Sequence, residues 1–326
     1  MQNQSVAGVY LDQIGSNPPE LDCSPGRSHR PGGGSWWVDG NRQMLSRARA
    51  SAGRGVGLFT EAGEEPFLGE VVGFLARIAL DEFPGAGVSP DIRMVPAFQA
   101  VYAGYHTAYG RNTTMPCSSV GFPAGDYCWR HPASIPKSTF FATVGQQLVL
   151  GIQLGWAGPF FADNNSTAGF SERGTSLLGI HVDPVLFSFF KQALAVRRTV
   201  RPYLLHGEFM RPLPGLGNYM AGAPCLADGC FAVQHAVWSS HSGDTNLLIL
   251  LVGVVQRSVH VLVELERYNL VPRRGYEMVQ IGPREGQRTV RAVLVPPATA
   301  VEYQLTLAPG EIVVLEVSAK QAQQLN

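Results

Sequence analysis

Two acidic residues stand directly after apolar segments of the sequence. Asp12 follows Val9–Leu11, and Glu61 follows Gly57–Thr60. In parallel α/β folds the reactive groups lie just past the carboxyl ends of strands, where burial and neighbouring charges change their pKa values. Two carboxylates on neighbouring strands can supply a nucleophile and a proton donor to a glycosidic bond. For each acid alone, a helix cap or a loop salt bridge is the alternative interpretation.

Aromatic residues gather after predicted strand ends. His29, Trp36 and Trp37 belong to the segment His29-Arg-Pro-Gly-Gly-Gly-Ser-Trp-Trp, Tyr102 follows a predicted third strand, and Trp156 ends a predicted fourth. Sugars have an apolar C–H face and a polar rim, so tryptophan rings beside flexible backbone donors suit them. The alternative is that one tryptophan packs into the wall of the fold. Three further aromatic side chains follow Tyr102, namely Tyr105, His106 and Tyr109.

Charge and motifs argue against several other classes of function. Lys+Arg and Asp+Glu both number 25, whereas nucleic-acid binding and polybasic membrane anchoring need excess positive charge. The sequence has no CxxC pair and no HExxH motif, and its eight histidines are scattered, so we expect no metal site. Gly53-Arg-Gly-Val-Gly precedes a strand instead of a helix, and Ser239-Ser-His-Ser-Gly lacks a strand–elbow–helix context. Neither a phosphate loop nor a hydrolase serine is indicated, and we expect no cofactor.

The composition is that of a globular protein of about two domains. Of 326 residues, 45% are hydrophobic and 15% charged. The longest apolar stretch, Leu247–Val255, is too short to cross a bilayer, and the first residues, MQNQSVAGVY, lack the pattern of a signal peptide. These features do not assign the protein to a cellular compartment. The spacings Cys117 to Cys128 and Cys225 to Cys230 allow small disulfide loops or free thiols.

The first two thirds of the chain alternate predicted strands and helices, which is the pattern of a parallel sheet with helical crossovers. We expect strands at Val6–Leu11, Val56–Thr60, Ile92–Phe98 and Gly151–Trp156. We expect helices from about Trp37 to Ala52, from Pro66 with an apolar face of Val71, Phe74, Leu75 and Ile78, at Phe140–Val149, and at Val185–Leu204. Residues 1–211 are therefore predicted to form an α/β domain.

In the last third of the chain the spacing of apolar residues and turn residues changes. Seven short β-rich runs are separated by turn residues, which is typical of an antiparallel sandwich. They are Phe231–Trp238, Leu247–Val255, Val259–Leu265, Glu277–Ile281, Thr289–Leu294, Val301–Leu307 and Ile312–Val317. Residues 212–326 are therefore predicted to form a second, all-β domain.

Several segments of the sequence resemble the DUF6259 proteins. They are Gly8-Val-Tyr-Leu-Asp-Gln-Ile-Gly, Pro31-Gly-Gly-Gly-Ser-Trp-Trp, Thr60-Glu61 with Glu65-Pro66, and Ala236-Val-Trp-Ser. DUF6259 proteins are glycoside-hydrolase-like (β/α)8 barrels with a C-terminal β-sandwich, similar in plan to retaining endo-α-N-acetylgalactosaminidases and related α-glycosidases. The resemblance implies an α/β fold in which a partial TIM (β/α)8 barrel, its C-terminal half, is followed by an antiparallel β-sandwich.

The resemblance also implies roles for individual residues. In the related α-glycosidases the nucleophile is an Asp after the fourth barrel strand and the acid/base a Glu after the fifth, which by position are Asp12 and Glu61. Glu65 is a second candidate for the acid/base, because its segment is crowded with carboxylates. Tyr10 and Gln13 flank Asp12 and are candidates for substrate binding. On this placement the first three strands are absent from the sequence, and an open half barrel is expected.

The expected function is that of a retaining glycoside hydrolase, or the C-terminal portion of one. Asp12 would attack the anomeric carbon of an α-glycoside, and Glu61 would protonate the leaving oxygen. The expected partner is an oligosaccharide or glycoconjugate substrate, with no nucleic acid and no membrane span. The alternative is a non-catalytic carbohydrate-binding protein or truncated pseudoenzyme that keeps the aromatic cleft without turnover.

Overall fold

A computed structural model of the chain describes residues 7–12, 14, 21–61, 65–76, 97–110, 137–154, 184–216, 233–240, 246–271, 275–282 and 287–319. The chain divides into two compact units. Unit 1 comprises Met1–Arg77 and Tyr105–Arg111, and unit 2 comprises Ile78–Gly104 and Asn112–Asn326.

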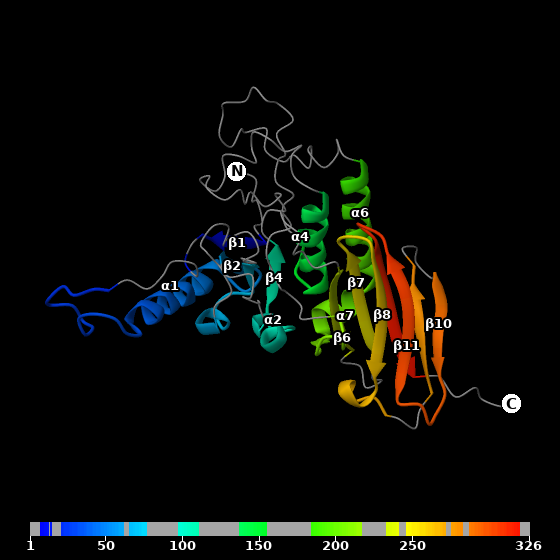
Figure 1. Cartoon of the computed structure of the whole chain (residues 1–326). Coiled ribbons are helices and arrows are strands. Elements are labelled where there is room, and N and C mark those ends of the chain that lie inside the picture. Colours follow the sequence, from blue (N-terminus) through cyan, green and yellow to red (C-terminus); the bar gives the residue numbers. More distant parts are fainter. Residues whose placement is uncertain are drawn as a thin grey trace. The chain divides into compact units, whose positions relative to one another are not determined.

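Unit 1 contains a four-stranded parallel sheet in the order β1-β2-β3-β4 (Figure 1). The strands are β1 (Gly8–Leu11), β2 (Gly57–Glu61), β3 (Gly73–Ala76) and β4 (Thr107–Gly110). The strands predicted at Val6–Leu11 and Val56–Thr60 are confirmed as β1 and β2.

The crossover from β1 to β2 contains α1 (Trp36–Ala52), which confirms the first predicted helix. The helix ends at Gly53, whose φ of +83° is a left-handed conformation that glycine adopts without strain. Its 17 residues give it a length of about 25 Å. This length separates the segment of residues 29–37, the glycine–tryptophan segment, from the start of β2, because the segment leads into the first turn of α1 and β2 follows its last turn.

The prediction of a helix from Pro66 onward is wrong. Glu65–Phe67 forms one 3-10 turn, η1, and the chain then enters β3, which pairs with β2 and β4. Gly73 explains the difference, because a Cβ at this position would lie 2.6 Å from the carbonyl oxygen of Thr107 and 2.9 Å from the ring of Phe59. Only a residue without a side chain lets β3 approach these neighbours so closely.

The third and fourth strands of the parallel sheet are β3 and β4, which are not the segments that the sequence indicated. From the predicted strand Ile92–Phe98, Phe98 belongs to a helix, α2 (Ala97–Tyr102), and residues 92–96 lie outside the described residues. From Gly151–Trp156, residues 151–154 form a turn and an isolated bridge. Residues 155 and 156 lie outside the described part of the chain, as does Ile78.

Unit 2 contains two antiparallel sheets. The first has six strands in the order β10-β9-β12-β7-β6-β5, and the second has two, β11-β8 (Figure 1). The strands are β5 (Glu208–Phe209), β6 (Val233–Ser239), β7 (Leu247–Gly253), β8 (Arg257–Glu264), β9 (Tyr276–Ile281), β10 (Arg288–Leu294), β11 (Ala300–Leu307) and β12 (Ile312–Ala319). All seven β-rich runs of the sequence are confirmed as β6 to β12.

The part of the six-stranded sheet of unit 2 that contains β6, β7 and β12 is covered on both faces. One face shares a hydrophobic core with β8 and β11, formed by alternate residues such as Val237, Ile249, Val261 and Leu315. The other face contacts α4 (Lys137–Val149), α6 (Pro184–Thr199) and α7 (Arg201–His206). Every residue of β6 and β7 is therefore buried. The sequence of β7 is accordingly a nearly continuous apolar run instead of an alternating one, whereas β6 also buries the polar side chains of Gln234, His235 and Ser239.

Trp238 on β6 joins this sheet to the helices. Its side chain is 1% exposed, and its indole Nε1 donates a hydrogen bond to the carbonyl oxygen of Val149, the last residue of α4, at 2.9 Å. The helices predicted at Phe140–Val149 and Val185–Leu204 are confirmed, the second as α6 and α7. These helices belong to the same compact unit as the strands that follow residue 212, and the predicted division at 211/212 stays a prediction.

Candidate functional site

The two faces of the parallel sheet in unit 1 differ in exposure. Parallel pairing places Leu58, Thr60 and Phe74 on one face, where all three are buried. The opposite face has larger, more accessible side chains, among them Tyr10 (39% exposed) and Tyr109. Because side chains alternate along a strand, the residues on this second face are the ones that can meet a ligand.

Asp12 and Glu61 lie at the carboxyl ends of adjacent strands. Leu11 of β1 pairs with Thr60 of β2, and the Thr60 hydroxyl donates to the carbonyl oxygen of Leu11 at 2.7 Å. The next residue on each strand is one of the two acids. Asp12 is exposed and Glu61 half-buried, so both carboxylates belong to the accessible end of the sheet.

An aromatic cluster supports these acids. The rings of Phe59 and Tyr109 meet edge-on with centroids 5.7 Å apart, and those of Tyr10 and Tyr109 meet edge-on at 6.4 Å. Phe59 rests on three glycines, because a Cβ at Gly8, Gly57 or Gly73 would lie 2.9–3.0 Å from its ring. Sequence reasoning missed Phe59 and its glycines. The signal was the spacing Gly57-Leu-Phe59 on a strand, where glycine marks a close approach.

Tyr10 and Tyr109 keep their hydroxyl protons at neutral pH and can therefore act as hydrogen-bond donors. Burial raises the pKa of the Tyr10 hydroxyl above its usual value, and its hydrogen bond to Asp12 and the negative charge of Glu61 raise it further. Burial, followed by the charges of Glu61 and Asp12, raises the pKa of Tyr109 to about 12. Both carboxylates therefore act electrostatically on both phenols, and the site combines two acceptors with two persistent donors.

The glycine–tryptophan segment forms a cluster of its own. His29 stacks on Trp36 with centroids 4.5 Å apart and an angle of 8°, and Trp36 meets Trp37 edge-on at 5.7 Å. His29 Nε2 lies 3.3 Å from Asp22 Oδ2, and Trp36 Nε1 donates to the carbonyl oxygen of Gly32 at 3.2 Å. His29 therefore covers one face of Trp36, which the sequence had suggested as a sugar platform.

The remaining sequence candidates other than Gln13 belong to other segments of the chain. Glu65 is exposed at the start of η1. Tyr102 lies on α2 in unit 2, where its ring packs against Phe98 with centroids 5.0 Å apart. Gln13 and Trp156 lie outside the described residues.

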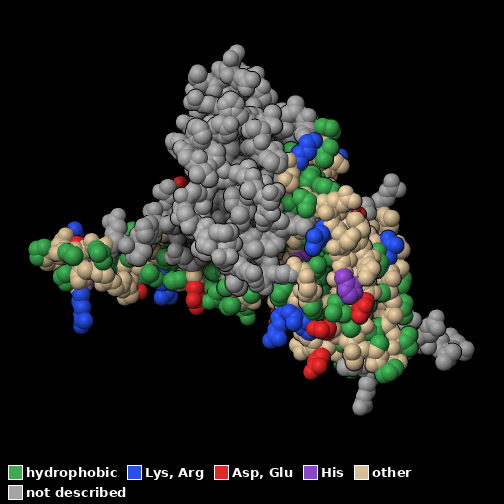
Figure 2. Space-filling model, viewed as in Figure 1, with side chains coloured by type: hydrophobic (Ala, Val, Ile, Leu, Met, Phe, Trp, Pro, Cys, Tyr) green, Lys and Arg blue, Asp and Glu red, His purple; other side chains and the backbone are tan. Residues whose placement is uncertain are grey.

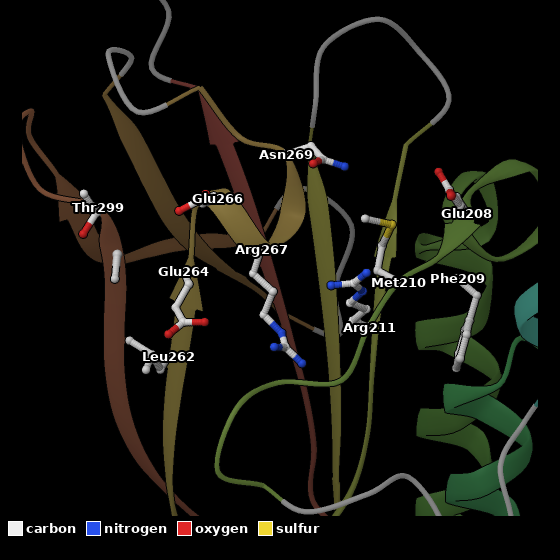
Figure 3. Close-up of a pocket in the computed structure, with 11 residues that line it drawn as sticks. Glu208, Phe209, Met210, Arg211, Leu262, Glu264, Glu266, Arg267, Asn269 and Thr299 are labelled. Carbon is white, nitrogen blue, oxygen red and sulfur yellow. The ribbon is translucent and has the colours of Figure 1, made fainter.

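Unit 2 has a groove of about 840 Å³ on its sheet surface (Figure 3). Glu264 of β8, Glu266 and Arg267 of the 3-10 turn η3 (Glu266–Tyr268), and Glu208 and Arg211 line it. Arg267 does not point freely into this space, because Nε and Nη2 donate to the carbonyl oxygen of Pro212 at 3.2 and 3.0 Å. Figure 2 shows the same mixture on the visible face of this unit, where acidic and basic side chains are interspersed.

Two further searches covered the described part of the chain. Within it, no group of three His, Cys, Asp or Glu side chains is placed to hold a metal ion. Among the same residues, no helix combines the length and the apolar character that crossing a membrane requires.

Comparison with known proteins extends this description of unit 1. The family model of a domain of unknown function, DUF6259, aligns with the start of the chain. Residues 1–113 match DUF6259. The matched region contains both acids, the aromatic cluster and all four parallel strands. The resemblance to DUF6259 proteins is therefore confirmed over these residues.

Three longer proteins are also similar to this chain. A Monosiga brevicollis protein provisionally named a glycoside hydrolase is 26% identical over 318 residues, which are 93% of this chain and 24% of that protein. A maltogenic α-amylase from Thermotoga neapolitana matches 96% of this chain and 61% of its own at 10% identity, with a TM-score of 0.50. A GH27 β-L-arabinopyranosidase from Geobacillus stearothermophilus matches 98% and 59% at 12% identity, with a TM-score of 0.46.

The chain is shorter than each of these three proteins. The chain spans about a quarter of the Monosiga brevicollis protein and about three fifths of the two solved structures. At 10% identity the likeness to the α-amylase is one of fold alone. The chain has an α/β fold with a sheet domain, in agreement with the strands and helices described above.

Proposed function

We propose that this chain has the function of a retaining glycoside hydrolase and cleaves an α-glycosidic bond, with Asp12 as nucleophile and Glu61 as acid/base. One observation carries the proposal: the two carboxylates end adjacent parallel strands on the accessible side of one sheet. Retaining cleavage requires two carboxyl groups on either side of the anomeric centre. The similarity to the Monosiga brevicollis protein supports a carbohydrate substrate, either an oligosaccharide or a glycoconjugate.

The arrangement of the sheet supports a partial barrel as the scaffold. β1 and β4 are separated by β2 and β3, which in a flat sheet is a distance of about 14 Å. Yet the rings of Tyr10 and Tyr109 are 6.4 Å apart. Strands that curve toward a common interior favour this approach, as they do in a (β/α)8 barrel. We propose that unit 2 contributes the accompanying β-sandwich through its two sheets and their shared core.

The proposed reaction has two steps. Asp12 attacks the anomeric carbon, the bond to the leaving oxygen breaks, and Glu61 donates its proton to that oxygen. Glu61 then removes a proton from water, which attacks the same carbon and releases Asp12 as a carboxylate. Glu65 is a second candidate for the acid/base role, and its exposed position on η1 is compatible with a proton donor outside the sheet.

Aromatic side chains are proposed to bind the sugar. Tyr10 and Tyr109 present donors beside the carboxylates, and Trp37 presents a ring in the glycine–tryptophan segment. His29 and Trp36, stacked on each other, would contact a sugar by their outer faces. Gln13, Tyr102 and Trp156 stay candidates from the sequence.

The test is turnover of a panel of aryl α-glycosides by the full chain. Asp12→Asn should abolish turnover, because it removes the nucleophilic charge while keeping the size of the side chain. Glu61→Gln should slow substrates with poor leaving groups by about 10²–10⁴-fold and activated ones much less, since only the former need a proton. Added azide should partly restore the turnover of Glu61→Gln, because this anion attacks the glycosyl-enzyme without needing a general base.

Glu302→Gln is the matched control, because Glu302 is an exposed carboxylate on β11 that contacts His260. Its turnover should equal that of the wild type. If Glu65→Gln shows the leaving-group dependence and Glu61→Gln does not, the acid/base role belongs to Glu65. Binding of the sugars with no turnover of any of them would instead support the non-catalytic carbohydrate-binding alternative.

A further inference from the structure

Asp12 accepts a hydrogen bond from a tyrosine on β1, the strand that precedes it. The Tyr10 hydroxyl donates to Asp12 Oδ1 at 3.1 Å. Tyr10 and Asp12 are two residues apart, so their side chains leave the strand on the same side. The Tyr10 ring contacts the Tyr109 ring, and the Tyr109 ring contacts the Phe59 ring, which packs against three glycines. The hydroxyl that holds Asp12 is therefore fixed by the parallel sheet.

This hydrogen bond makes the two oxygens of Asp12 different. Oδ1 is engaged by Tyr10, whereas no hydrogen bond from another described residue engages Oδ2, whose lone pairs can face a ligand. A hydrogen bond to a carboxylate is about twice as strong as one to a neutral acceptor. It therefore weakens when Asp12 becomes an ester and strengthens again when the carboxylate returns.

We propose that Tyr10 is a positioning residue that presents Asp12 Oδ2 to the anomeric carbon and stabilises the Asp12 carboxylate as it leaves in the second step. This inference rests on the proposed glycosidase function. In the first step Oδ2 forms the bond to carbon, the leaving oxygen takes the proton of Glu61, and Oδ1 becomes the ester carbonyl that Tyr10 still contacts. In the second step the carbon–Oδ2 bond breaks and its electron pair returns to Asp12 beside the donor.

The consequence is an unequal effect on the two steps. Loss of the Tyr10 hydroxyl leaves Asp12 a slightly better nucleophile that is less well oriented, so the first step changes little. The second step loses the donor that stabilises the departing charge. A hydrogen bond to a charged group contributes on the order of 10- to 100-fold in an equilibrium or a rate.

The first experiment needs no turnover. The full chain is labelled with tyrosine carrying ¹³C at Cζ, and the Tyr10 signal is identified by its loss in Tyr10→Phe. In Asp12→Asn and Asp12→Ala this signal should move, and its titration midpoint should fall toward that of an ordinary tyrosine, because the neighbouring charge is gone. An unchanged shift and midpoint in both variants would overturn the proposal.

The second experiment measures Tyr10→Phe on activated dinitrophenyl α-glycosides, for which the second step limits turnover. We expect kcat and KM to fall together by about 10- to 100-fold, while kcat/KM changes by less than about threefold, because kcat/KM reports the first step. Tyr203→Phe is the matched control. Tyr203 also donates to a carboxylate, Glu316 Oε1, at 2.6 Å, but it lies in unit 2.

Tyr203→Phe should leave kcat and KM at their wild-type values. A fall in kcat/KM with KM unchanged in Tyr10→Phe would mean that the tyrosine serves only the fold or the first step, and this would overturn the proposal. A wild-type chain that turns over none of the glycosides would refute the proposed function and the kinetic role together. The NMR coupling of Tyr10 to Asp12 would in that case still support the positioning contact.

Discussion

Replacing Gly73 by alanine tests the packing that holds the candidate site together. A Cβ at this position would lie 2.6 Å from the carbonyl oxygen of Thr107 and 2.9–3.0 Å from two ring atoms of Phe59. The first contact is with backbone and cannot be relieved by a rotamer change, so β3 and β4 must separate, and the second contact requires Phe59 to move as well. Overpacking of this kind costs about 1–3 kcal/mol. Strand propensity alone predicts the opposite sign, because glycine weakens a strand by roughly 0.5–1 kcal/mol relative to alanine.

Gly69→Ala is the matched control for this prediction. Gly69 lies four residues earlier, has no positive φ, and has nothing within 4 Å of an added Cβ. This substitution should stabilise the fold by at most about 1 kcal/mol, since it restricts the unfolded chain without a clash.

Urea unfolding measures the stability of both glycine variants, and amide hydrogen exchange followed by peptide mass spectrometry locates the change. Faster exchange is expected in peptides that cover β2, β3 and β4 of Gly73→Ala, and not in β7 or β12 of unit 2. Equal stabilities for Gly73→Ala and Gly69→Ala, or faster exchange spread over unit 2, would refute the close packing at Gly73.

Three further predictions concern stability and geometry. Trp238→Phe should lower the free energy of unfolding by about 1–3 kcal/mol, measured by urea unfolding, because the Val149 carbonyl loses its buried donor. Burial lowers the pKa of His235 to about 4, so it is neutral in the folded state and protonates in the unfolded one near pH 6.5. Stability should therefore fall by about 3 kcal/mol between pH 6.5 and 4, and His235→Gln should remove this loss in acid unfolding titrations. A crystal structure should place the carboxyl groups of Asp12 and Glu61 about 5–5.5 Å apart, and a separation of about 6.5–9.5 Å would indicate inversion.

The sequence by itself determined much of the local structure. The seven β-rich runs became β6 to β12, because each combines apolar and β-branched residues with turn residues at its ends. The helix α1 was readable from its glycine stop at Gly53. The two acids, Asp12 and Glu61, were identified because each directly follows an apolar run, and the pairing of β1 with β2 makes them neighbours along the end of the sheet.

Tertiary structure decided what depends on contacts between distant segments. The segment after Pro66 has a helical spacing of apolar residues, yet Gly73 belongs to a strand because Phe59 and the Thr107 backbone occupy the space that a side chain would need. No pattern in the sequence around these residues predicts that the His29 ring stacks on the Trp36 ring.

The hydrogen bond from Tyr10 to Asp12 also depends on tertiary contacts, because rings on β2 and β4 fix the tyrosine that makes it. The local sequence determines the secondary-structure propensity of a segment and the face of the strand or helix on which each side chain lies. Which neighbour fills the space beyond is determined only when the strands are brought together, because close packing admits one occupant at each position.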